Sequence, residues 1–183
     1  MFFKKLFMIG FSLTILSCDN VSKNEVKIDA PQSQEDYSGP VEVNIITSGK
    51  MAKDPAFNAI VDPSGLTITL ADTQASQENG VYFIISSPEE DKLSGKNAQI
   101  RIKARSISED LIKFRANYYT LELGNSGWWD FEATSISQDF IIEYKIPTMV
   151  KGKGDTLRIL PILYNKSQGL VVEEIEVLGT DKP

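Results

Sequence analysis

Histidine is absent from this 183-residue chain, and cysteine occurs once, at Cys18. Without histidine the chain forms no Ser-His-Asp triad, no Cys-His dyad and no histidine-ligated zinc site. A single cysteine excludes an internal disulfide and any Cys-x-x-Cys motif. Basic residues are also in the minority, with 19 Lys and Arg against 25 Asp and Glu, which gives a formal net charge of −6. Because an acidic protein repels phosphate backbones, we do not expect a nucleic acid partner.

Long apolar runs are equally scarce, and the longest lies near the N-terminus. Lys4 and Lys5 precede an apolar segment at residues 6–16. As a helix this segment is only about 16 Å long, whereas the hydrocarbon core of a bilayer is about 30 Å thick. A basic pair followed by a short apolar segment is typical of a secretion signal and not of a membrane span.

The apolar segment ends in Ile15-Leu16-Ser17-Cys18. This tetrapeptide resembles the lipobox of bacterial lipoproteins. The resemblance implies a signal peptide at residues 1–17, a diacylglycerol on Cys18, and a protein anchored to a membrane of the bacterial cell envelope, facing the periplasm or the cell surface. Acyl chains contribute about 0.8 kcal/mol for each buried CH₂, so two or more chains anchor a protein stably. The alternative is an ordinary cleavable signal with a chance cysteine.

Residues 19–39 are polar and of mixed charge, and they show no sustained period of 2 or 3.6 residues. Such a composition cannot bury enough apolar surface to offset the entropy lost on ordering. We therefore expect residues 18–39 to be a flexible tether that begins with the lipidated Cys18.

From residue 40 to residue 183 the dominant pattern is alternation of apolar and polar residues. Ile100, Ile102 and Ala104, for example, alternate with basic residues. A period of two indicates strands with one buried face. Nine strands are expected, at residues 41–47, 66–70, 81–86, 99–105, 114–119, 128–133, 140–146, 157–163 and 171–178.

Turn sequences such as Glu78-Asn79-Gly80 separate these strands, and only residues 54–60 and 108–113 suggest a short helical turn. No segment carries a long helical stripe, which argues against alternating strands and helices. The expected fold is therefore all-β: an antiparallel two-sheet β-sandwich of about nine strands, spanning residues 40–183.

The order of several short motifs resembles the galactose-binding-like jelly rolls of carbohydrate-binding modules. The motifs are Ala104-Arg105-Ser106, Asn117-Tyr118-Tyr119, the loop at residues 124–128, and the strands at residues 140–147, 155–161 and 172–177. This resemblance implies a jelly-roll fold, a carbohydrate ligand and, in some members, a structural calcium ion. Fold alone does not fix function, so the ligand must be argued from a site.

Carbohydrate-binding modules stack exposed aromatic rings on sugar rings. Trp128 and Trp129 are the first candidates, and Tyr119 is a further one. Neighbouring residues of a strand point to opposite faces, so at most one of the two tryptophans belongs to the core if the other faces solvent. The alternative is that one tryptophan is a core residue and the other anchors a loop.

Polar residues on two strands form a second candidate site. Arg105 shares a face with Arg101 and Lys103, whereas Arg115 and Asn117 share a face with Tyr119. If both strands belong to one sheet, these residues form a cationic platform for an acidic polysaccharide, because guanidinium groups match carboxylates and sulfates. The alternative is a solvated face with cross-strand ion pairs to Glu143 and Glu132.

Calcium needs several oxygen ligands, and Asp62, Asp72 and Asp155 stand at expected loop ends. The alternative is that these aspartates cap turns. We expect no other cofactor.

We expect non-catalytic carbohydrate recognition by an exported, lipid-anchored protein. One alternative is an envelope assembly lipoprotein that binds a protein partner, and the other is a polysaccharide-active enzyme. A lyase would use Tyr118 or Tyr119 as base beside Arg115. The acidic pair Glu173 and Glu174 is a weak glycosidase candidate, because neighbours on a strand point apart.

Overall fold

The structure is a computed structural model that describes residues 40–48, 50–72, 75–121, 123–148 and 154–181. The predicted signal peptide, the lipidation site at Cys18 and the predicted tether lie outside the described residues. In the described part of the chain, no helix is both long and apolar enough to cross a membrane.

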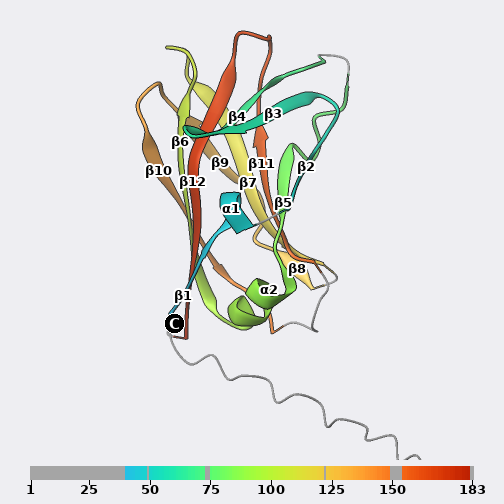
Figure 1. The fold of residues 1–183 in the computed structure, drawn as a ribbon, viewed down its shortest axis with the longest axis vertical. Coiled ribbons are helices and arrows are strands. Elements are labelled where there is room, and N and C mark those ends of the chain that lie inside the picture. The colour runs from blue at the N-terminus through green and yellow to red at the C-terminus, as the bar shows by residue number, and fades with distance from the viewer. Residues whose placement is uncertain (1–39, 49, 73–74, 122, 149–153, 182–183) are drawn as a thin grey trace, which may run out of the picture. The chain divides into compact units, whose positions relative to one another are not determined.

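Two antiparallel sheets face each other (Figure 1). Sheet A has the order β10-β6-β12-β4-β3, and β1 also pairs with β12; sheet B has the order β2-β5-β11-β7-β8, and β9 also pairs with β7. The strands of sheet A are β1 (Val41–Asn44), β3 (Phe57–Asp62), β4 (Gly65–Leu70), β6 (Asn97–Ser106), β10 (Gln138–Lys145) and β12 (Gly169–Thr180). The strands of sheet B are β2 (Lys50–Lys53), β5 (Val81–Ile84), β7 (Ile112–Thr120), β8 (Gly124–Asn125), β9 (Trp129–Ala133) and β11 (Thr156–Pro161). The predicted all-β two-sheet sandwich is confirmed.

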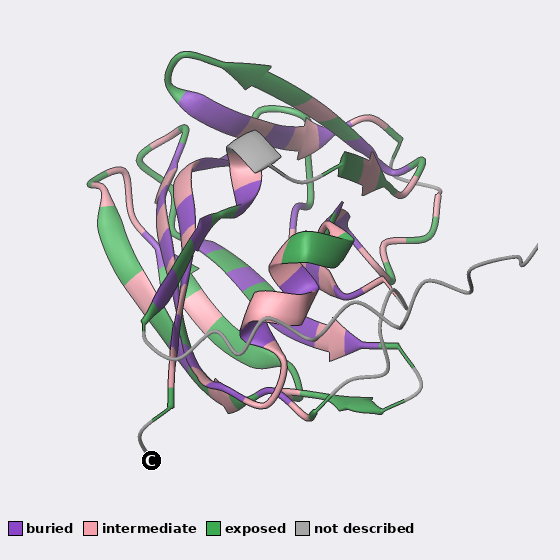
Figure 2. Cartoon of the chain, turned by 60° about the horizontal axis from the view of Figure 1, so that its bottom comes forward, coloured by how far each residue is buried: buried purple, intermediate pink, exposed green. Residues whose placement is uncertain are grey.

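Alternation along each strand explains why the sheets pack on one face. In β6, Ile100, Ile102 and Ala104 are fully buried, while Arg101 and Lys103 remain partly exposed. Figure 2 shows the same change between buried and more exposed positions along strands of both sheets. Because each buried aliphatic side chain contributes roughly 1.5–3 kcal/mol, the two inner faces hold the sandwich together.

An aromatic cluster joins the two sheets near their margins. The Phe114 ring on β7 lies 5.3 Å from Phe131 on β9 and 5.0 Å from Phe140 on β10, measured between ring centroids. The Phe131 and Phe140 centroids are 5.2 Å apart. Such tilted and edge-to-face contacts stabilise beyond the area that they bury. The cluster therefore fixes β9 of sheet B against β10 of sheet A.

Glycine is required where β5 and β4 begin. Gly80 has φ +71°, and a Cβ atom added there would lie 2.2 Å from the carbonyl oxygen of Ile159 on β11. Gly65 has φ +120°, and its Cβ would lie 2.3 Å from the carbonyl oxygen of Val172 on β12. A side chain at either position would therefore be strained and would collide with the neighbouring strand.

The expected secondary structure differs from the structure at four segments, two of which were expected to be helical. Residues 54–60 form a turn and the start of β3, and residues 108–113 lead directly into β7. Residues 45–48, expected at the end of a strand, form α1 (Ile45–Ser48). The helix α2 (Ser87–Leu93) was not predicted, although its start carries a recognisable signal. The Glu89 carboxylate accepts hydrogen bonds from the Ser86 N–H at 3.2 Å and the Ser86 hydroxyl at 2.8 Å, as a capping sequence of this type favours.

Candidate functional site

The two groups of predicted site residues lie on different sheets. Arg105 is on β6 of sheet A, whereas Arg115, Asn117 and Tyr119 are on β7 of sheet B. The inner faces of the two sheets pack on the same core, so their outer faces point in opposite directions. The expected platform that combines Arg105 with Tyr119 is therefore wrong.

Ion pairs cover the outer face of sheet A. Arg101 lies 2.8 Å from a Glu176 oxygen and 3.1 Å from a Glu174 oxygen, and Arg105 lies 3.2 Å from a Glu173 oxygen. The hydrogen bond from Arg101 lowers the pKa of the Glu176 carboxyl. This arrangement matches the expected alternative of a solvated, ion-paired face.

Of the two acids predicted for such pairs, Glu132 does form a cross-strand ion pair, but with Lys113 on sheet B, whereas Glu143 is not the partner on sheet A. Glu173 on β12 takes the place expected for Glu143, and Glu132 pairs at 3.3 Å with Lys113 on β7. The reason is the register, because Glu143 on β10 lies opposite Gln99, whereas β12 presents Glu174 opposite Lys103 and Glu176 opposite Arg101.

A register shift between Val172 and Glu174 makes β12 irregular. As a result Glu173 and Glu174 both contact basic residues of β6, although neighbours on a regular strand point apart. The expectation that this acidic pair diverges is wrong. Both carboxylates are engaged in ion pairs, which leaves neither as an unoccupied catalytic acid.

Side chains of a different kind gather on the outer face of sheet B. Arg158 on β11 is paired in register with Tyr82 on β5 and with Asn117 on β7. Two residues earlier on β11, and therefore on the same face, Thr156 pairs with Tyr119. We define the sheet B face as these outward-facing residues together with Arg115 and Trp128. Neither Tyr82 nor Arg158 was predicted as a site residue, because alternation within a strand does not reveal which strands are neighbours.

The tryptophans are both accessible, with 39% of Trp128 and 38% of Trp129 exposed. Trp129 pairs with the buried Ala116, which places it on the core side of β9, and its Nε1 donates to the Ser126 carbonyl oxygen at 3.3 Å. Trp128 lies just before β9, after Gly127, whose carbonyl oxygen accepts a hydrogen bond from Asn117; by extending the alternation of β9 we assign Trp128 to the outer side. The alternative in which one tryptophan is buried in the core is wrong.

Asn117 holds the loop that leads to Trp128. It is only 4% exposed, and its Nδ2 donates to Asn125 Oδ1 at 3.3 Å and to the Gly127 carbonyl oxygen at 3.0 Å. Nearby, Arg115 Nε donates to Asp130 Oδ1 at 2.7 Å. Both residues are thus engaged within the protein, and Asn117 has little surface left for a ligand.

Tyr118 is fully buried, so it does not provide the exposed base that a lyase would need. Its hydroxyl donates to Asp155 Oδ2 at 2.7 Å, and the Asp155 N–H donates to the Glu90 carboxylate. Burial, the largest cause, and the nearby Glu90 together raise the pKa of Asp155 to about 6, although the hydrogen bond from Tyr118 acts to lower it. Burial also raises the pKa of Tyr118. The cluster lies between α2, β7 and β11 and is part of the interior.

The predicted calcium ligands do not come together. Asp62 precedes β4 and Asp72 follows it, so about 20 Å of strand separates them. Asp62 Oδ1 accepts hydrogen bonds from the Ser64 N–H at 2.7 Å and the Ser64 hydroxyl at 2.6 Å, and these bonds lower the pKa of Asp62. This is the turn-capping role that was the alternative. Over the described ranges, no three acidic or cysteine side chains are grouped as a metal site requires.

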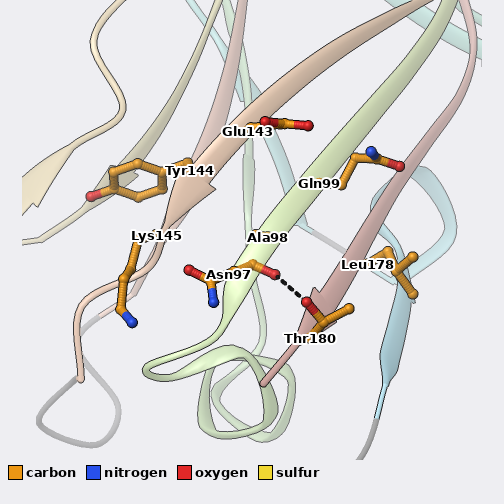
Figure 3. A pocket seen from close by; sticks show the side chains of 8 residues that line it. All are labelled: Asn97, Ala98, Gln99, Glu143, Tyr144, Lys145, Leu178 and Thr180. Carbon is orange, nitrogen blue, oxygen red and sulfur yellow. Dashed lines mark hydrogen bonds between the residues drawn. The ribbon is translucent and has the colours of Figure 1, made fainter. Parts of the chain in front are cut away.

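A hollow of about 460 Å³ lies at one end of sheet A, where β6, β10 and β12 run side by side (Figure 3). Its lining residues are Asn97, Ala98, Gln99, Glu143, Tyr144, Lys145, Leu178 and Thr180. The Tyr144 ring points away from Glu143 and Gln99 in this view, and it lies 5.9 Å from the buried Tyr118 ring. Tyr144 is thus the one aromatic residue among those that line the hollow, and its ring lies near the buried Tyr118, so the sheet B face with its several accessible rings is the better site.

No family model matches the sequence, and no curated protein matches it. Among solved structures, a mutant of the family 29 carbohydrate-binding module CBM29-2 is similar with a TM-score of 0.50 and 7% identity, over 76% of this chain and 86% of that chain. The xylan-binding module CBM15 gives a TM-score of 0.49 and 11% identity, over 80% of this chain and 99% of that one.

The CBM36-1 domain of a multidomain xylanase from the hindgut metagenome of Trinervitermes trinervoides gives a TM-score of 0.47 and 8% identity, over 79% of this chain and 100% of that one. At such identities the likeness concerns the fold alone. The sandwich is thus arranged like the jelly rolls of carbohydrate-binding modules, as the sequence motifs implied.

Proposed function

We propose that this protein is an exported, lipid-anchored module that binds carbohydrate without transforming it, and that the sheet B face is its binding surface. The observation that carries the proposal is that Tyr82 and Arg158 lie in register on neighbouring strands, with the buried Asn117 next in the row and the exposed Trp128 at the end of the loop that Asn117 holds. The similarity of the fold to carbohydrate-binding modules supports this choice of ligand.

The row offers the two features that sugars need. Aromatic rings pack on the apolar faces of sugar rings, while polar groups between them bond to hydroxyls. Tyr82 and Trp128 are separated by three strand spacings, which amounts to about 14 Å. A short stretch of polysaccharide that crosses the strands would contact both rings and pass over Arg158.

Sheet A offers no comparable surface in the part that the structure describes. Its outward positions carry charged residues, several of them in ion pairs, polar residues such as Gln99 and aliphatic residues such as Ile141. Its aromatic residues, Phe57, Phe140 and Tyr144, belong to the inner face. The contrast favours sheet B as the carbohydrate-binding side.

Affinity electrophoresis in gels that contain soluble polysaccharides tests the proposal. A double variant, Tyr82→Ala with Trp128→Ala, should lose about tenfold or more in affinity, since each aromatic contact contributes roughly 0.5–1.5 kcal/mol. Ile141→Ala removes an exposed apolar side chain from sheet A and is the matched control. Undiminished retention of the double variant, or release of reducing sugars by the parent protein, would contradict the proposal.

The lipid anchor is tested separately by fractionation of cells that express the full chain. Cys18→Ser should move the protein from the membrane to the soluble fraction, because the acyl chains have no other attachment point in the lipobox. Ser17→Ala keeps a small residue before the cysteine and should stay with the membrane. Equal membrane association of the Cys18→Ser variant and the parent would refute the anchor.

A further inference from the structure

We infer that the sheet B face selects an acidic glycan and that Arg158 is the residue that recognises its uronate carboxylate. This inference rests on the proposed carbohydrate-binding function and adds the class of sugar. The starting point is a difference among the four arginines of the chain.

Arg158 differs from the other arginines in its partners. Arg101, Arg105 and Arg115 each bond to at least one carboxylate. Arg158 instead donates from Nη1 to Asn79 Oδ1 at 3.2 Å and from Nε to Thr156 Oγ1 at 3.4 Å, and both acceptors are neutral. Within the described residues no carboxylate forms an ion pair with Arg158, so its charge remains available to a ligand.

The Arg158 guanidinium is held in place before any ligand arrives. It lies over the Tyr119 ring, 4.6 Å from the ring centroid. Asn79 is itself fixed, because its N–H donates to Asp54 Oδ2 at 2.7 Å and its Nδ2 donates to Asp54 Oδ1 at 3.4 Å. A fixed guanidinium loses little side-chain entropy on binding, and its planar geometry matches a carboxylate.

The position of Arg158 suits a charged sugar between two stacked ones. It lies on the strand between Tyr82 and Asn117, inside the span from Tyr82 to Trp128. Tyr119 gives one ring face to the guanidinium, so we assign it the role of orienting Arg158 and not that of stacking on a sugar.

Local charge supports the same ligand. On the sheet B face, Lys113 pairs with Glu132 and Arg115 pairs with Asp130, so these four charges cancel. Arg158 then supplies a positive charge within the row, although Asp54 lies one hydrogen bond away behind Asn79 and the chain as a whole carries a formal charge of −6. The net charge opposes an acidic polymer at long range, so the preference for a uronate depends on its short-range contact with the Arg158 guanidinium.

The test compares polysaccharides that differ only in the carboxylate. Affinity electrophoresis is run with polygalacturonate, alginate and glucuronoxylan, each beside its carboxyl-reduced form. We expect at least one acidic polymer to bind about tenfold or more tightly than its reduced form, with a preference that weakens as NaCl is added. Equal or weaker binding of every acidic polymer, with binding of reduced forms retained, overturns the inference and leaves the proposed function standing. Binding to no polymer overturns the proposed function itself.

Variants identify the residue. Arg158→Gln should abolish the preference for the acidic polymer, because it lowers binding to the acidic form by about tenfold and binding to the reduced form by much less. Arg105→Gln, on the opposite sheet, should keep the full preference. A preference that survives Arg158→Gln in a variant with unchanged circular dichroism would overturn the assignment of Arg158, as would tighter binding to a sulfated neutral galactan than to every uronate polymer.

Discussion

The two outer faces of the sandwich carry similar residue types and use them differently. On sheet A, Arg101 bridges Glu174 and Glu176, so the basic residues of β6 are balanced by the acids of β12. On sheet B, Arg158 has neutral partners and stands between exposed or half-buried rings. A basic residue on a strand is therefore informative about ligand binding only when the neighbouring strand does not already neutralise it.

The comparison also shows what the ion pairs of sheet A accomplish. Exposed pairs contribute little individually, but a network around one guanidinium also prevents repulsion between the neighbouring carboxylates. On sheet A, the charges of the β6 arginines are thus neutralised by carboxylates of the protein itself. Sheet B leaves aromatic surface and one guanidinium open to solvent, which is why we assign function to it.

The largest expected effect on stability comes from replacing the two glycines that lie close against the backbone of a neighbouring strand, one in each sheet. Gly80→Ala should lower the free energy of unfolding by roughly 2–4 kcal/mol, because it adds left-handed backbone strain to a collision with β11. Gly65→Ala should do the same through β12. Only Gly80→Ala should also weaken glycan binding by the folded protein, since Gly80 precedes the strand that carries Tyr82.

Thermal and urea denaturation measure the stability of these variants. Gly127→Ala is the matched control: it also has positive φ, at +74°, but its Cβ would meet nothing within 4 Å. A Gly80→Ala variant as stable as Gly127→Ala would show that β5 is not packed on β11 as described.

An intermediate effect on stability, one that depends on pH, is expected from the buried carboxyl group of Asp155 beneath sheet B. The pKa of Asp155 is raised by burial to about 6 from an ordinary value of 3.8. The folded state therefore holds this proton more tightly than the unfolded state does, so its stabilising contribution is complete below about pH 3.8 and declines as the pH rises to about 6.

The difference in unfolding free energy between the parent and an Asp155→Asn variant isolates this contribution. Relative to the variant, the parent should become less stable between about pH 4 and pH 6 and then level off, since Asn does not titrate. Urea denaturation at closely spaced pH values provides the measurement. A difference that is flat over this range would show that the carboxyl group titrates normally.

The smallest expected effect contrasts one arginine from each face. Arg101→Gln removes the centre of an ion-pair network and should lower the free energy of unfolding by about 1 kcal/mol, less at high salt. Arg158→Gln leaves no carboxylate of the described residues without its partner and should change stability by no more than about 0.5 kcal/mol. Equal losses for the two variants would mean that the faces do not differ as we describe.

The sequence allowed nine of the twelve strands in the described part of the chain to be predicted, because burial imposes a period of two that is visible in residues such as Ile100 and Ile102; β2, β3 and β8 were not predicted. It did not allow the neighbours of each strand to be predicted. Tyr82, Arg158 and Asn117 come from distant segments, and only the pairing of β5, β11 and β7 brings them together. The same missing information led Arg105 to be grouped with Tyr119.

Local departures from regular structure explain the remaining differences. The irregularity at Val172 and Glu174 changes which side chains share a face, and no turn residue marks it in the sequence. The start of α2 was predictable in principle, since Ser86 and Glu89 have the spacing of a helix cap. Asn117 could not be identified as a loop anchor, because its partners Asn125 and Gly127 depend on how the loop folds back.

Mapping the ligand on the folded domain tests the central claim most directly. An oligosaccharide from the polysaccharide that retains the protein is titrated into isotope-labelled protein, and changes in backbone amide chemical shifts are recorded. We predict that the changes concentrate on β5, β7, β11 and the loop before Trp128. Changes that concentrate instead on β6, β10 and β12, around the hollow near Asn97, would contradict the assignment of the sheet B face.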